Sequence, residues 1–135
     1  MEKITVEAVL DNLQTVIDFA TENLEKRDCP MKVSMQLELV IEEIFVNIAS
    51  YAYHPEIGAA TFCMSFEENP SAVLMTFIDG GKPYNPLEHD DPDTTLDVDE
   101  RDIGGLGIFL VKKNVDEISY EYADGKNILR MKKFF

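Results

Sequence analysis

Apolar residues recur at helical spacing near the start of the chain, after a short alternating run. Residues 3–6 alternate between polar and apolar side chains, which predicts a short edge strand. The helix expected after it has an apolar face made of Leu13, Val16, Ile17, Ala20 and Leu24. Asp11, followed three residues later by Gln14, predicts a capping box at the start of this helix, and Pro30 predicts its end.

A second helix carries the strongest apolar pattern in the sequence. It is expected to begin between residues 31 and 35 and to reach about Tyr51. Its apolar stripe consists of Leu37, Val40, Ile41, Ile44, Phe45, Ile48 and Ala52. At about 100° per residue, Glu43 and Asn47 lie one above the other on the margin of this stripe, whereas Glu42 points to the far side. The pattern directs a carboxylate and a carboxamide towards the edge of the core, unless this margin is an ordinary solvated flank.

Two runs rich in β-forming residues follow, at residues 61–67 and 72–78. Residues 68–71, with the sequence Glu-Asn-Pro-Ser, separate them and predict an antiparallel hairpin. The second run leads into Asp79, and two glycines come directly after it. Glycines at a strand end allow a planar ligand to lie against exposed backbone, although a plain Asp-Gly turn has the same sequence.

The segment from residue 87 to residue 103 has no hydrophobic periodicity and carries many carboxylates against a single Arg101. A long segment without a pattern is typical of a lid over a site or of a solvated surface loop. A run of glycines at residues 104–107 then precedes a helix predicted over residues 108–115. Free backbone N–H groups at the start of a helix bind anions such as phosphate, although an ordinary glycine-rich turn has the same pattern.

The last two predicted strands, residues 117–122 and 128–133, flank an Asp-Gly turn and form a second antiparallel hairpin. The order of the elements predicts an α+β fold, a two-layer sandwich with helices on one face of a mixed, mostly antiparallel sheet. A chain of 135 residues without an internal repeat or linker is expected to be one domain, residues 1–135.

The formal net charge of -14 argues against a nucleic-acid-binding surface, because no cluster of Lys and Arg is present. A phosphate ligand therefore needs backbone dipoles and a divalent cation to overcome the general field. No apolar run is long enough to cross a bilayer, so no membrane contact is expected. Cys29 and Cys63 lack metal-ligand spacing, and without a secretory leader they are interpreted as reduced core thiols in the cytoplasm.

Three motifs in this order resemble the GHKL superfamily of ATP-binding domains, and within it the single-domain anti-sigma-factor serine/threonine kinases of bacteria. Ile41-Glu42-Glu43-Ile44-Phe45-Val46-Asn47 is similar to the asparagine box of that family. Asp79-Gly80-Gly81-Lys82-Pro83-Tyr84 is similar to its first glycine box. Gly105-Leu106-Gly107-Ile108-Phe109-Leu110-Val111 is similar to its second glycine box. The resemblance covers nearly the whole chain.

The resemblance implies ATP and Mg²⁺ as cofactors and gives roles to several residues. Asn47 is implied to ligate Mg²⁺ through its amide oxygen, a hard donor suited to that ion. Asp79 is implied to accept a hydrogen bond from the exocyclic amino group of adenine, with Gly81 in the same ATP-binding loop. Glu43, one helical turn before Asn47, is implied to act as general base on the hydroxyl of a protein serine.

The phosphates of ATP are implied to bind the second glycine motif, at Gly104, Gly105, Leu106 and Gly107. Arg101 is implied to approach the γ-phosphate as charge develops there. Asn127 in the final hairpin is implied to join the adenine contacts, or else it is a satisfied strand-end asparagine. Pro83 departs from the pattern, because many relatives carry a second, later glycine there.

The resemblance implies a cytoplasmic ATP-dependent protein kinase that acts as an anti-sigma factor. Its substrate is expected to be a serine on an anti-anti-sigma (STAS-type) antagonist, and its other partner a sigma factor. The family also implies a possible homodimer. The alternative function is a nucleotide-gated interaction module with little or no phosphoryl transfer.

Overall fold

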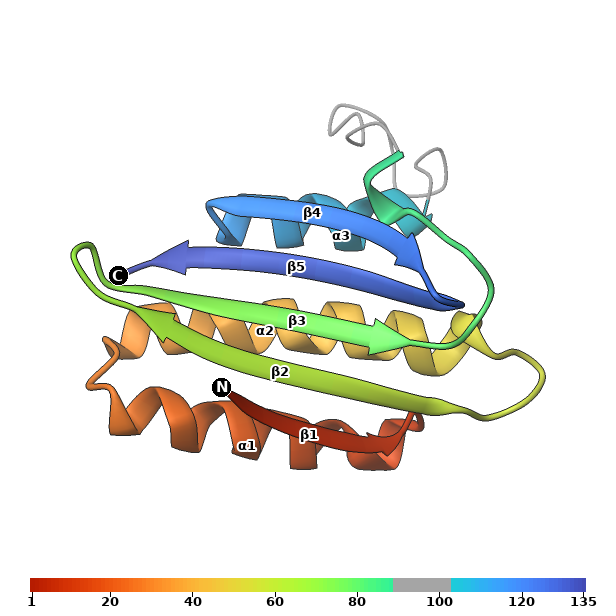
Figure 1. Cartoon of the computed structure of the whole chain (residues 1–135), viewed down its shortest axis with the longest axis horizontal. Coiled ribbons are helices and arrows are strands. Elements are labelled where there is room, and N and C mark those ends of the chain that lie inside the picture. Colours follow the sequence, from red (N-terminus) through yellow and green to blue (C-terminus); the bar gives the residue numbers. More distant parts are fainter. Residues whose placement is uncertain (89–102) are drawn as a thin grey trace.

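The computed structural model describes residues 1–88 and 103–135, with residues 103–106 described by their backbone alone. In these parts of the chain, a five-stranded sheet lies in front of three α-helices (Figure 1). The strands are β1 (Glu2–Glu7), β2 (Ala59–Glu67), β3 (Ala72–Asp79), β4 (Glu117–Ala123) and β5 (Lys126–Phe134). The helices are α1 (Leu13–Lys26), α2 (Met31–Asn47) and α3 (Ile103–Asn114). The expected α+β sandwich is confirmed.

The sheet has the order β1-β2-β3-β5-β4, and each neighbouring pair is antiparallel. The described sheet is therefore fully antiparallel rather than mixed. Both predicted hairpins are present, β2 with β3 and β4 with β5. The pairing of β3 with β5 places Asp79 directly opposite Asn127, which brings two polar residues that are far apart in the sequence to one end of the sheet.

The core lies between the helices and the face of the sheet that they cover. Alternate residues of the central strands point into it and are buried: Phe62, Met64, Met75, Phe77, Leu129 and Met131. The apolar stripe of α2 packs against this face, with Leu37, Val40, Ile41 and Phe45 fully buried. Burial of each such large side chain contributes roughly 1.5–3 kcal/mol, so this face fixes the position of α2 over the sheet.

The start of α1 differs from the prediction. Asp11 lies in a 3-10 turn, Leu10–Asn12, and no side chain caps α1 at its N-terminus. The Gln14 side chain donates a hydrogen bond to Asp18 instead, at 2.8 Å. The capping box was wrong because the 3-10 turn moves the helix start past Asp11.

The second helix runs as predicted but changes its geometry at the end. After Asn47, the chain continues in a π-helical turn, Ile48–Ala52. Such wide turns are rare and occur frequently at functional sites. The sequence predicted that the helix reaches about Tyr51, but it gave no sign of the wider turn.

The third helix begins at Ile103, earlier than the predicted residue 108. The glycine run therefore lies in the first turns of α3 rather than before it. Ile108 and Val111 are buried, and Phe109 is half-buried. The helix packs against α2. Within the described part of the chain, no helix is both long and apolar enough to span a bilayer.

Candidate functional site

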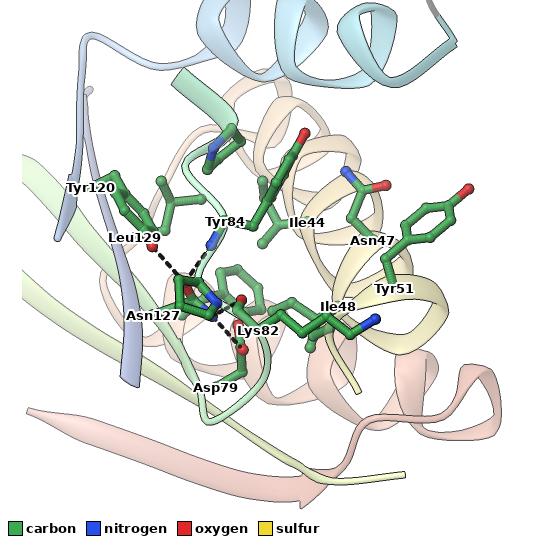
Figure 2. A pocket seen from close by; sticks show the side chains of 14 residues that line it. Ile44, Asn47, Ile48, Tyr51, Asp79, Lys82, Tyr84, Tyr120, Asn127 and Leu129 are labelled. Carbon is green, nitrogen blue, oxygen red and sulfur yellow. Dashed lines mark hydrogen bonds between the residues drawn. The ribbon is translucent and has the colours of Figure 1, made fainter. Parts of the chain in front are cut away.

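A cavity of about 480 Å³ opens between the end of α2, the ends of β3 and β5, and residues 80–85, here called the 80–85 loop. Its walls are mostly apolar and include Ile44, Ile48, Phe77 and Leu129. Figure 2 shows polar side chains entering it from different elements. A mostly apolar cavity with a few polar groups is the usual form of a small-molecule site.

Asp79 lies at one end of the cavity and is only 7% exposed. Its Oδ1 atom accepts hydrogen bonds from the Gly81 N–H at 2.9 Å and from Asn127 Nδ2 at 3.0 Å. Among the described residues, none donates to Oδ2, and no buried side-chain oxygen lacks a partner. Oδ2 is therefore the part of Asp79 that remains open to the cavity, where it can accept a hydrogen bond from a ligand.

Asn127 joins the elements around Asp79 and is itself 7% exposed. Its Oδ1 atom accepts hydrogen bonds from the Tyr84 N–H at 3.1 Å and the Tyr120 hydroxyl at 2.5 Å. Its Nδ2 group donates to Asp79 Oδ1 and to the carbonyl oxygen of Lys82, the latter at 2.8 Å (Figure 2). These contacts use both donors and both lone pairs of the amide. Of the two expectations, the geometry favours a satisfied strand-end asparagine that reaches a ligand only through Asp79.

Tyr120 supports this arrangement from β4. Desolvation by burial raises the pKa of its hydroxyl, outweighing the hydrogen bond with the Tyr84 backbone, which lowers it. The hydroxyl therefore stays protonated over the physiological range and remains a donor to Asn127.

Gly81 holds the 80–85 loop against the π-helical turn. A Cβ atom at this position would lie 2.3 Å from the carbonyl oxygen of Ala52. The same carbonyl accepts a hydrogen bond from the Lys82 N–H at 3.0 Å. The close approach that requires glycine here is to the protein's own backbone, and this contact places the loop at the cavity.

A second contact fixes the beginning of the same loop. The Gly80 N–H donates to the Tyr53 hydroxyl at 2.6 Å, and this hydroxyl donates to the carbonyl oxygen of Ala59 at 2.6 Å. Gly58 leaves space for the Tyr53 ring, because a Cβ atom there would lie 2.2 Å from it. The 80–85 loop is thus hydrogen-bonded to two successive residues after α2, Ala52 and Tyr53.

Asn47 and Glu43 lie on the same flank of α2, as their spacing predicted. Asn47 lines the cavity and is half-buried, and its amide has no hydrogen-bond partner in the described parts of the chain. Glu43 is also half-buried, whereas Glu42 is exposed. A Cβ atom on Gly107 would lie 2.7 Å from Glu43 Oε2, so this carboxylate lies directly against α3.

The structure brings Asn47 and Asp79 to one cavity, with Glu43 and Gly107 together about one helical turn, roughly 5.4 Å, along α2 from Asn47. Gly104 and Gly105 lie in the first turn of α3, where the leading backbone N–H groups have no partner within the helix. Leu106 and Gly107 follow as the fourth and fifth residues of the helix, and their N–H groups are used by the helix itself. Arg101 lies outside the described residues, as does most of the acidic segment.

The donors present fit a magnesium ion that is shared with a ligand. Within residues 1–88 and 103–135, no cluster of three His, Cys, Asp or Glu side chains is arranged to hold a metal ion by itself. The amide oxygen of Asn47 is a hard donor with no other partner there. Mg²⁺ is commonly held by one or two protein oxygens together with water and substrate phosphates, and Asn47 suits that role.

The sequence did not single out Tyr84, Lys82 and Tyr120, which also line the cavity. Their positions depend on the pairing of β3 with β5 and on the path of the 80–85 loop, neither of which is a local property. A helical projection of α2 could have predicted that Ile44 and Ile48 line the same cavity, because they lie one turn apart on one face.

Comparison with known proteins agrees with this geometry. The family model described as histidine kinase-like ATPase domain matches residues 6–133, a range that contains every residue of the cavity named above. Serine/threonine-protein kinase BtrW of Bordetella bronchiseptica is 27% identical over 100 residues, which cover 74% of this chain and 70% of the relative. The chain is similar to both over most of its length.

Proposed function

This chain belongs to the histidine kinase-like ATPase domain family, and we propose that it is an ATP-dependent serine/threonine protein kinase that acts as an anti-sigma factor. The observation that carries the proposal is a pair of polar groups in one cavity that have no hydrogen-bond partner among residues 1–88 and 103–135, Oδ2 of Asp79 and the amide of Asn47. One is suited to a base with an exocyclic amino group and the other to a metal-bound triphosphate.

In this proposal, adenine lies against the apolar wall formed by Ile48 and Phe77. Its amino group donates to Asp79 Oδ2, because the other oxygen already accepts two hydrogen bonds. Asn127 holds the carboxylate in place and keeps Oδ1 occupied. A base with a carbonyl oxygen in place of the amino group would meet a second acceptor at Asp79, so adenine is preferred over guanine.

The phosphates extend from the base towards Asn47 and the first turn of α3. Mg²⁺, when bound, supplies positive charge that neutralises the phosphate oxygens, and Asn47 provides one oxygen ligand. Gly104 and Gly105 offer backbone N–H groups, while contacts from Leu106 and Gly107 would require the first turn of α3 to unwind. Gly81 contributes by placing the loop, and Arg101 is proposed to meet the γ-phosphate.

Glu43 is proposed as the general base. Its carboxylate has no hydrogen-bond or ion-pair partner among the described side chains, and it lies one turn from Asn47. It accepts the proton of a substrate serine as the serine oxygen bonds to the γ-phosphorus and the bond to the β-phosphate oxygen breaks, leaving ADP. Most of the rate enhancement comes from positioning and charge stabilisation.

The proposed substrate is a serine of an anti-anti-sigma protein, and the proposed binding partner is a sigma factor. The printed name of the relative from Bordetella bronchiseptica, a serine/threonine-protein kinase, supports a protein hydroxyl as acceptor. Both cysteines are free, which suits the cytoplasm proposed as its location. A homodimer is part of the same proposal.

A thermal-shift titration tests the nucleotide site. ATP with Mg²⁺ is expected to raise the melting temperature of the wild type, since a ligand that binds only the native state stabilises it. Asp79→Asn is expected to lose most of this shift, because the amide replaces an acceptor oxygen. An equal shift in wild type and variant would contradict the adenine assignment.

Phosphoryl transfer is tested with labelled ATP and a candidate anti-anti-sigma protein. Label on a serine of that protein supports the kinase. ATP binding without transfer to any candidate would instead support the nucleotide-gated interaction module.

A further inference from the structure

Lys82 lies within the first glycine motif and lines the cavity, but the resemblance gave it no role. Its N–H donates to the carbonyl oxygen of Ala52 on the π-helical turn, at 3.0 Å. Its own carbonyl oxygen accepts a hydrogen bond from Asn127 Nδ2 on β5, at 2.8 Å. Gly81 lies directly before it and packs on Ala52. The backbone of Lys82 is therefore held from both sides, and the origin of its side chain is fixed relative to the cavity.

The Lys82 side chain is exposed and lines the cavity. Figure 2 shows it extending from the 80–85 loop across the cavity, with its amine towards Ile48 and Tyr51. It makes no ion pair with the described residues. Lys132, in contrast, contacts Glu67 at 2.8 Å. No described residue therefore occupies the Lys82 ammonium.

Because the chain has a formal net charge of -14, an ammonium group at the cavity strongly affects how an anionic ligand is attracted there. The sequence has 26 acidic residues against 12 basic ones, and the cavity itself contains the carboxylate of Asp79. A polyanionic ligand is repelled by this field, and a cation at the cavity lowers the repulsion where it is needed. Ammonium groups act as point charges on phosphate.

We propose that Lys82 is a nucleotide-binding residue whose ammonium attracts the phosphate-bearing part of the ligand rather than its base. This rests on the proposed ATP site and adds to it a described cation near Tyr51, four residues after Asn47. From there the ammonium acts through its field on phosphates bound at Asn47, without direct contact with α3. The contribution is electrostatic, so it decreases as salt concentration rises.

The test measures the dissociation constants of ATP and of adenosine by isothermal titration calorimetry, at low and high salt. The variants are Lys82→Gln and Lys126→Gln. Lys126 is a matched control because it is exposed, carries the same charge, and lies close to Gly80 of the same loop without lining the cavity. Lys82→Arg keeps the charge and tests rescue.

Lys82→Gln is expected to weaken ATP binding on the order of threefold to tenfold at low salt, with a smaller effect at high salt. Adenosine binding should be unchanged. Lys126→Gln should change ATP binding less than about twofold, because it alters only the general field. Lys82→Arg should restore most of the affinity. Melting temperatures without ligand should match across the variants, since no hydrogen bond or ion pair from the Lys82 side chain to a described residue is removed.

Equal losses in Lys82→Gln and Lys126→Gln would overturn the proposal, because the effect would then come from net charge alone. A loss of adenosine affinity as large as the loss for ATP would overturn it as well. If the wild type binds ATP and Lys82→Gln binds it equally well, only the role of Lys82 is refuted. If the wild type binds no adenine nucleotide, the proposed function fails and Lys82 with it.

Discussion

Replacing Asn127 by alanine removes the side chain on which the geometry of the cavity most depends. The variant loses the hydrogen bonds to Tyr84 and Tyr120, and the two that Nδ2 donates to Asp79 and Lys82. The carbonyl oxygen of Lys82 then loses this donor, and the Tyr84 N–H loses one acceptor but keeps its hydrogen bond with the Tyr120 hydroxyl. Asp79 keeps a single donor on Oδ1.

The size of the effect follows from the kinds of bonds that are lost. A neutral hydrogen bond contributes about 1 kcal/mol net, and one to a charged group about 1.5–3 kcal/mol. Because the site borders the cavity, water can reach some of the exposed groups and recover part of this energy. We therefore expect Asn127→Ala to lower the free energy of unfolding by about 2–4 kcal/mol, a large share of the roughly 5–15 kcal/mol typical of a domain.

Urea denaturation followed by circular dichroism measures this loss. Asn12→Ala is the matched control, because Asn12 makes one exposed hydrogen bond, from Nδ2 to the carbonyl oxygen of Glu7 at 2.9 Å. Its expected cost is about 0.5–1 kcal/mol. ATP affinity should fall in Asn127→Ala, measured below the urea transition, and stay unchanged in the control. Two variants of equal stability would refute the reasoning that Asn127 organises the site.

Three further predictions follow from contacts described above. Gly81→Ala should lower the free energy of unfolding by about 1–3 kcal/mol, because its Cβ would lie 2.3 Å from a backbone oxygen. The control, Gly80→Ala, should lower it by less than about 0.5 kcal/mol. Equal losses for the two variants in urea denaturation would contradict this. In an ultraviolet titration, Tyr120→Phe should remove the tyrosine that ionises above the ordinary pKa. The protonated hydroxyl of Tyr120 stabilises the folded state below about pH 10, and this contribution is lost as pH rises through the raised pKa of the folded state. A variant whose ultraviolet titration is unaltered would exclude Tyr120 as the tyrosine with the raised pKa. Glu43→Ala should keep ATP binding and lose at least about 100-fold in phosphoryl transfer, with Glu42→Ala as an active control; full transfer by the Glu43 variant would remove it from its role.

The sequence predicted the elements whose signals are local. The apolar stripe of α2 fixed the face that it buries, and so placed Glu43 and Asn47 on one flank and Glu42 on the other. The hairpin signals located β2 and β3, and so placed Asp79 at a strand end. The resemblance of three motifs added the family, which the matched family model confirms.

What the sequence did not predict depends on contacts between distant residues. The contact of Asp79 with Asn127 requires the pairing of β3 with β5, which no local pattern encodes. Gly81 was interpreted as a surface for a ligand, but the backbone at Ala52 fills that space. The early start of α3 was missed because glycine disfavours helix, and packing against α2 outweighs that local preference.

Strand β5 lies between β3 and β4, although it follows both along the chain. A nascent chain that is still being synthesised before residue 126 has β3 paired with β2 but not with β5, and Asp79 without Asn127. Such a chain lacks the two lining residues that β5 supplies to the cavity, Asn127 and Leu129. The cavity is therefore complete only late in the biosynthesis of this protein, once β5 has paired with β3.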